Sequence, residues 1–89
     1  MSYETTLAWI ADLTEYAKLR PMTQDAHTQI GMQMHTATDD IKRLYPERWD
    51  DAVAALNAMW LAWIQADPDE ASRVRWLERA EGGWFRVAI

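Results

Sequence analysis

The stretch VAALNAMWLAWI, residues 53–64, decides the fold of this chain because it is apolar around almost the whole circumference of a helix. Its main face at helical spacing consists of Trp49, Val53, Leu56, Trp60 and Trp63. Its opposite side is also apolar, through Ala54, Ala58, Leu61 and Ala62. A helix that is apolar nearly all round is normally buried. We therefore expect this helix, predicted over residues 47–66 just after Pro46, to be the central element of the fold.

Three further helices are predicted on either side of this stretch, because apolar residues recur there every three or four positions. They cover residues 3–20, 24–44 and 68–81. Ser2 and Thr23 are expected to cap the first two, and the pair Gly82-Gly83 to end the last. The sequence predicts an all-α fold, a small bundle of about four helices that forms a single domain over residues 1–89.

The residues expected to face the core repeat at helical spacing along each of these three helices. In the first helix they are Tyr3, Leu7, Ile10, Leu13 and Ala17. In the second they are Ala26, Ile30, Met34, Ala37, Ile41 and Leu44, and in the fourth they are Val74, Trp76, Leu77 and Ala80. Gly31 interrupts the second helix and is expected to allow a neighbouring helix to approach closely.

The fourth helix has the clearest start signal in its sequence. Asp67 is predicted as the N-cap, Pro68 as the first helical residue and Glu70 as the capping-box partner of Asp67. Proline suits the first position because it lacks the N–H that would be unpaired there.

Composition excludes several classes of protein. The 89 residues include no cysteine, so neither a disulfide nor a thiolate metal site can stabilise the chain. The net charge of −5 repels phosphate backbones and argues against nucleic-acid binding. No apolar run is long enough to span a bilayer, and the first residues lack the pattern of a signal peptide. We therefore expect a cytoplasmic protein without a membrane partner.

Few residues could carry chemistry. His27 and His35 are eight residues apart and lack the spacing of a zinc pair, and His35 is expected to face away from the core. Asp39 lies one turn from His35, but two ligands do not make a metal site. Within each acid doublet, at 39–40 and at 50–51, the two side chains point about 100° apart on a helix, so they do not converge on one substrate atom. The sequence predicts no catalytic residue, no metal, no cofactor and no enzymatic activity.

Helix 68–81 and the tail contain the only candidate basic surface. It consists of Arg73, Arg75, Arg79 and Arg86. A helical DNA-associated regulator that uses these arginines is the alternative interpretation, although the acidic residues between them argue against it.

Aromatic residues are abundant, with six tryptophans, and tryptophan is enriched at protein interfaces. Trp9, Tyr16 and Arg20 form a second stripe on the first helix and are candidate partner-binding residues. Alternatively, the bundle wraps far enough to cover the two aromatic residues. Met32 lies opposite the core stripe of its helix and is a further candidate contact.

The chain ends in GGWFRVAI, residues 82–89, which has strand propensity after four helices. Its candidate binding residues are Trp84, Phe85, Arg86, Val87 and Ile89. A lone strand cannot pair its own backbone groups, so the segment could pair with its twin, lie in a groove of its own bundle or add to a partner's sheet edge. We expect a homodimer formed through this tail, in which Phe85, Val87 and Ile89 cover the alanine side of helix 47–66.

Together these features predict a small acidic helical module that binds another protein, whose identity the sequence does not give. A non-catalytic inhibitor or adaptor fits best, and the pattern is typical of such proteins from phages and mobile elements.

Overall fold

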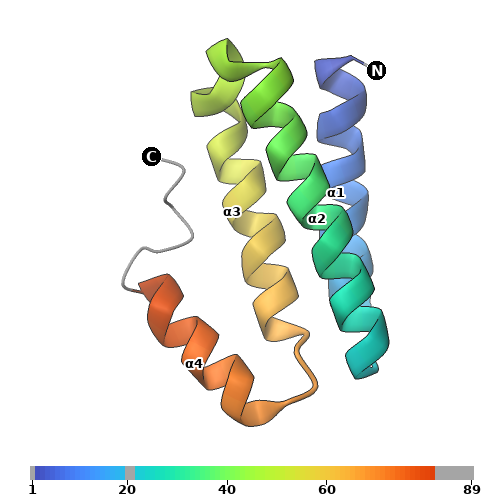
Figure 1. The fold of residues 1–89 in the computed structure, drawn as a ribbon, viewed down its shortest axis with the longest axis vertical. Helices are drawn as coiled ribbons and strands as arrows, with labels where there is room; N and C mark the ends of the chain where they lie inside the picture. The colour runs from blue at the N-terminus through green and yellow to red at the C-terminus, as the bar shows by residue number, and fades with distance from the viewer. Residues whose placement is uncertain (1, 20–21, 82–89) are drawn as a thin grey trace.

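In the computed structural model, which describes residues 2–19 and 22–81, the chain folds into four α-helices and one short 3₁₀ turn. The helices are α1 (Tyr3–Leu19), α2 (Gln24–Leu44), α3 (Trp49–Gln65) and α4 (Glu70–Glu81). Figure 1 shows α1, α2 and α3 side by side along the long axis, while α4 turns away at the end of α3. No strand occurs in these described ranges, and the predicted all-α fold is confirmed.

The first two helices begin at the predicted capping residues. The backbone N–H of Thr5 donates to the Ser2 hydroxyl at 3.1 Å, and that of Ala26 donates to the Thr23 hydroxyl at 3.1 Å. Each bond satisfies an N–H that has no partner within its helix. Both helices have the extent that their apolar periodicity predicts, apart from Arg20, which lies outside the described residues.

The predicted start of the third helix at residue 47 is wrong by two residues. The 3₁₀ turn η1, Pro46–Arg48, precedes α3, and the N–H of Arg48 donates to the Tyr45 carbonyl at 2.9 Å. Pro46 has no N–H to donate and favours such a tight entry turn. The turn reverses the chain, so that α3 runs back along α2 (Figure 1).

The core is built by α1, α2 and α3, and α3 is its central element because it contacts each of the other three helices. Most of the residues predicted to face inward from α1 and α2 are buried, whereas Leu7 and Ala26 are partly buried and Leu44 is 48% exposed. The most deeply buried apolar side chains are Ile10, Met34, Ala37, Ile41, Ala52, Met59 and Ile64.

The predicted main face of α3 needs a correction. Its buried face runs through Ala52, Leu56, Met59 and Ala62, whereas Trp49, Val53, Trp60 and Trp63 are only half-buried. Alanine lets the backbones of neighbouring helices approach closely, and large indole rings fit better at the edge of a contact. Because α3 is apolar nearly all round, its periodicity could not distinguish these two faces.

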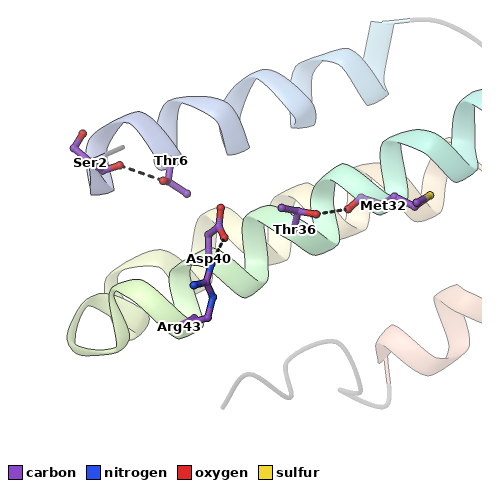
Figure 2. A network of polar contacts seen from close by, with 6 residues as sticks. All are labelled: Ser2, Thr6, Met32, Thr36, Asp40 and Arg43. Carbon is purple, nitrogen blue, oxygen red and sulfur yellow. Dashed lines mark hydrogen bonds and ion pairs between the residues drawn. The ribbon is translucent and has the colours of Figure 1, made fainter.

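Two threonines of α1 donate hydrogen bonds from their hydroxyls to backbone carbonyls one turn earlier in the chain. The buried Thr14 donates to the Ile10 carbonyl at 2.7 Å, and Thr6 donates to the Ser2 carbonyl at 3.1 Å (Figure 2). Such bonds to the preceding turn satisfy polar groups that face the core. The bundle therefore contains polar residues at buried positions of α1 without leaving their hydroxyls unpaired.

The predicted start of the fourth helix is also wrong. The helix begins at Glu70, and its cap is Asp69, whose carboxylate accepts the N–H of Ser72 at 3.1 Å. Asp67 is buried instead, and its carboxylate accepts the N–H of Asp69 at 2.9 Å. Pro68 therefore lies in the turn before the helix. Two aspartates flank Pro68, and the buried one forms the turn while the exposed one caps.

The contact of α4 with the bundle is shallow. Of the residues predicted to face inward, Trp76 and Leu77 are half-buried and Val74 is 48% exposed, while the Ala80 side chain lies outside the described set. No side chain between residues 70 and 79 is buried. The helix packs against α3, and the guanidinium of Arg73 donates to the Asp67 carbonyl at 3.0 Å.

Candidate protein-binding groove

An open groove of about 460 Å³ runs between α2, α3 and α4. It is lined by Gln24, His27, Thr28, Gly31, Met32, His35, Trp60, Trp63, Asp67, Ser72 and Trp76. A second hollow of about 560 Å³ lies near the C-terminal ends of α1 and α3, and its lining contains no aromatic ring. Because large aromatic side chains dominate binding energetics, the first groove is the better candidate site.

The floor of the groove is fixed by a reciprocal contact between His27 and Trp63. The His27 Nε2 lies 2.8 Å from the Trp63 carbonyl oxygen, and the Trp63 indole N–H donates to the His27 carbonyl at 2.9 Å. The two rings stack with their centroids 4.2 Å apart. A carbonyl can only accept, so Nε2 of His27 carries the hydrogen. These contacts fix the position of α2 relative to α3.

His27 lies off the predicted core stripe of α2, yet it is buried, with 2% of its surface exposed. Gly31, one turn further along α2, provides the physical reason. A Cβ atom at Gly31 would lie 2.8 Å from Nε1 of Trp63, so only glycine leaves room for the indole ring. The close approach predicted at Gly31 is therefore confirmed. The sequence signal for this site was a glycine inside a helix, one turn after a histidine.

Two more tryptophans extend the floor into an aromatic row. Trp60 meets Trp63 edge-to-face at 5.6 Å, and Trp63 meets Trp76 of α4 edge-to-face at 5.8 Å. The indole N–H of Trp60 donates to the Thr38 hydroxyl at 3.0 Å. The N–H groups of Trp60 and Trp63 are thus used within the fold, and their rings present mainly apolar surface to the groove.

Met32 lies on the α2 side of the groove and is 61% exposed. Its backbone carbonyl accepts a hydrogen bond from the Thr36 hydroxyl at 3.1 Å (Figure 2). The expectation that Met32 lies outside the core is confirmed, and the structure places it beside the aromatic row. His35, one turn further along, also lines the groove and is exposed.

The other predicted partner-binding residues do not line this groove. Trp9 is half-buried and packs against the core, while Tyr16 is 41% exposed on α1. For Trp9, the alternative that the bundle covers it holds in part. Arg20 and the predicted tail residues lie outside the described residues. Those tail residues are Trp84, Phe85, Arg86, Val87 and Ile89.

The arginines of the alternative nucleic-acid surface make different contacts within the fold. Arg73 is half-buried and donates to the Asp67 carbonyl, and the Arg79 guanidinium lies 5.2 Å from the centre of the Trp76 ring. Arg75 is exposed, and Arg86 lies outside the described residues. Two of the four cations therefore support α4 instead of forming a continuous basic face.

Charged side chains elsewhere point to separate neighbours. In the two acid doublets, Asp40 pairs with Arg43 at 3.2 Å (Figure 2) and Asp51 pairs with Arg48 at 3.4 Å. Among residues 2–19 and 22–81, no three histidine or acidic side chains form a group that could hold a metal ion. No helix in these same ranges has the length and apolar character needed to cross a membrane.

Comparison of the chain with protein families, with curated proteins and with solved structures finds no match. The class of this protein is therefore described from its fold and its groove alone. It is a small all-α protein in which two helices of a three-helix bundle and a fourth helix border an open groove lined by aromatic residues.

Proposed function

We propose that this protein is a non-catalytic protein-binding module, an inhibitor or adaptor that holds another protein in the groove between α2, α3 and α4. The observation that carries the proposal is Met32, a large apolar side chain 61% exposed beside the row of Trp60, Trp63 and Trp76. Methionine and tryptophan are enriched where proteins bind one another. A concave surface of this composition suits the apolar anchor of a partner.

The polar groups of the groove support binding over catalysis. The His27 Nε2 is bonded to the Trp63 carbonyl, and the carboxylate of the buried Asp67 accepts the N–H of Asp69. A general acid or base must reach the proton that it transfers. These two groups hold the fold instead, and the groove offers a ligand ring surface, the Met32 thioether and the exposed side chain of His35.

The test compares two exposed apolar residues of α2. Met32→Asp places a charge in the groove, whereas Leu44→Asp places one at a 48% exposed position outside it. Each variant and the parent protein are used to capture partners from an extract of the source cells. We expect Met32→Asp to lose the partner that the parent retains, because a charge buried at an interface is costly. The Leu44→Asp protein should keep it.

Equal capture by both variants would contradict the proposal. Circular dichroism and urea denaturation of both proteins provide the control for folding. Because both side chains are largely exposed, each substitution is expected to change the free energy of unfolding by no more than about 0.5 kcal/mol.

Homodimerisation through residues 84–89 remains a separate prediction, because that segment lies outside the described residues. A small cysteine-free domain gains stability by association, which supports the idea. Sedimentation velocity of the full chain and of a chain ending at residue 83 tests it. A full-length monomer at high micromolar concentration would exclude the homodimer. A cytoplasmic location likewise remains a prediction from the sequence.

A further inference from the structure

We propose that the groove takes an amphipathic helix of the partner, with apolar side chains on the aromatic row and basic side chains against α2. This inference rests on the proposed function above and specifies the chemistry of its partner. Three features of the described residues carry it: the length of the groove, the state of its polar groups and the charges along α2.

The length of the groove suits a helix of about three turns. Its α2 wall runs from Gln24 to His35, which at 1.5 Å per residue is about 17 Å. A partner helix with apolar anchors at positions i, i+4 and i+7 covers most of that length. An extended peptide would need an unpaired sheet edge to bond its backbone, and no strand occurs between residues 22 and 81.

The polar groups of the floor also favour a helix. The indole N–H of Trp60 donates a hydrogen bond to the Thr38 hydroxyl, and that of Trp63 donates one to the His27 carbonyl. Such a floor offers few hydrogen bonds to a partner's backbone, and unpaired backbone groups are costly to bury. A helix pairs its own N–H and carbonyl groups, so it can present apolar side chains alone.

The acidic residues along α2 favour basic residues on the side of the partner helix that faces α2. Asp25, Met32 and Asp39 are spaced by seven residues, so they follow one another along the same side of α2. Both aspartates are exposed, and no lysine or arginine occurs from Gln24 to Ile41. This side of α2 therefore has a carboxylate two turns before Met32 and another two turns after it, although neither aspartate is among the residues that line the groove.

The α4 side has no such excess of acidic residues, because α4 contains three arginines and three glutamates. Arg79 lies over the ring of Trp76, so a cation accompanies the far end of the aromatic row. A partner helix with basic residues toward α2 matches this polarity, and the chain's net charge of −5 would attract it at long range. The basic flank is expected to speed association, while the apolar anchors provide most of the affinity.

A display library of helical peptides of about 15 residues, selected on the folded full-length protein, tests this partner class. We expect the selected peptides to share apolar residues at helical spacing and lysine or arginine on one flank. Their affinity should fall at least about tenfold for Met32→Asp and stay unchanged for Leu44→Asp. Replacement of both Asp25 and Asp39 by asparagine should weaken binding a few-fold and reduce its dependence on salt.

The results separate this inference from the proposed function. Peptides that lose binding with Met32→Asp but have acidic flanks or no helical spacing would overturn the partner class and leave the protein-binding groove intact. Peptides that bind Met32→Asp and the parent equally would overturn both. A library that yields no binder would also contradict the inference, because a preformed apolar groove should select such helices.

Discussion

The three-helix bundle and α4 differ in how they are held in place. In α1, α2 and α3, side chains such as Ile10, Met34 and Met59 are at most 1% exposed. In α4, no side chain between residues 70 and 79 is buried, and the contact includes Trp76 on Trp63 and Arg73 on the Asp67 carbonyl. Burial of apolar surface provides most of the free energy of folding. The bundle therefore contributes the stability, and α4 contributes a wall of the groove.

The difference has a consequence for dynamics. An isolated helix of fewer than about 12–15 residues is marginal in water, so the 12 residues of α4 depend on α3 for their order. Regions with few buried contacts open at lower free energy than the core. A groove between a stable bundle and a weakly held helix can therefore change its width without loss of the fold.

The strongest test of the bundle is Met59→Ala, because Met59 is fully buried in α3. We expect the free energy of unfolding to fall by about 2–5 kcal/mol through lost burial and the cavity left behind. Val74→Ala in α4, at a 48% exposed position, is the matched control and should change it by less than about 0.5 kcal/mol. Urea denaturation measures both, and equal losses would erase the distinction between the two regions.

The junction of bundle and groove is tested by Gly31→Ala. The new Cβ would lie 2.8 Å from Nε1 of Trp63, an indole that is stacked and hydrogen bonded and so cannot easily move. We expect a net loss of about 1–2 kcal/mol, because the overpacking outweighs the better helix propensity of alanine. Gln33→Ala, at an exposed position of α2, should not destabilise. A stabilised Gly31→Ala protein would show that the indole is free to shift.

The attachment of α4 is tested by Trp76→Ala. This substitution removes the edge-to-face contact with Trp63 and should cost about 1 kcal/mol, less than Met59→Ala. Amide protection should fall in residues 71–79 and stay nearly unchanged in α1 and α2, as hydrogen exchange can measure. Loss of protection throughout the bundle would instead place Trp76 among the residues that hold the core.

The smallest effect is expected at the start of α4. Asp69→Ala should speed hydrogen exchange of the Ser72 amide, because this amide donates a hydrogen bond to the Asp69 carboxylate. Asp67→Ala should instead speed exchange mainly of the Asp69 amide, which donates to the Asp67 carboxylate. If Asp67→Ala frays the Ser72 amide more than Asp69→Ala does, the assignment of the cap is wrong.

This cap also depends on pH. Hydrogen bonds from Ser72, with smaller contributions from Arg75 and Arg73, lower the pKa of Asp69 below its ordinary value. A lowered pKa in the folded state means that the cap stabilises α4 above the ordinary pKa of an aspartate. That contribution is lost as the pH falls through the folded-state pKa. Exchange of the Ser72 amide should therefore quicken, relative to amides of α2, in that acidic range.

The bundle could be predicted from the sequence where apolar residues recur on one face only. In α1 and α2 this periodicity located the helices and most of their buried residues, and Ser2 and Thr23 marked their starts. In α3 the same reasoning chose the tryptophan face over the face that contains Ala52, Leu56, Met59 and Ala62, because an all-round apolar helix does not indicate its own orientation.

The groove was harder to predict because its parts come from three helices. Only Met32 was identified as a candidate contact, from its place opposite the core stripe. His27 lies off the apolar stripe of α2, so its periodicity did not indicate that this residue is buried. Its burial depends on Trp63, 36 residues away, fitting over Gly31. Such a long-range contact cannot be read from local spacing.

Native-state hydrogen exchange of the full-length protein, followed amide by amide in low concentrations of urea, can separate the two regions in one experiment. We expect the amides of α4 to exchange through an opening of lower free energy than those around Met34 in α2 and Met59 in α3, which should require global unfolding. If the amides of α4 exchange only with global unfolding, as those of α2 and α3 do, then α4 is an integral part of the core and not a weakly held wall of the groove.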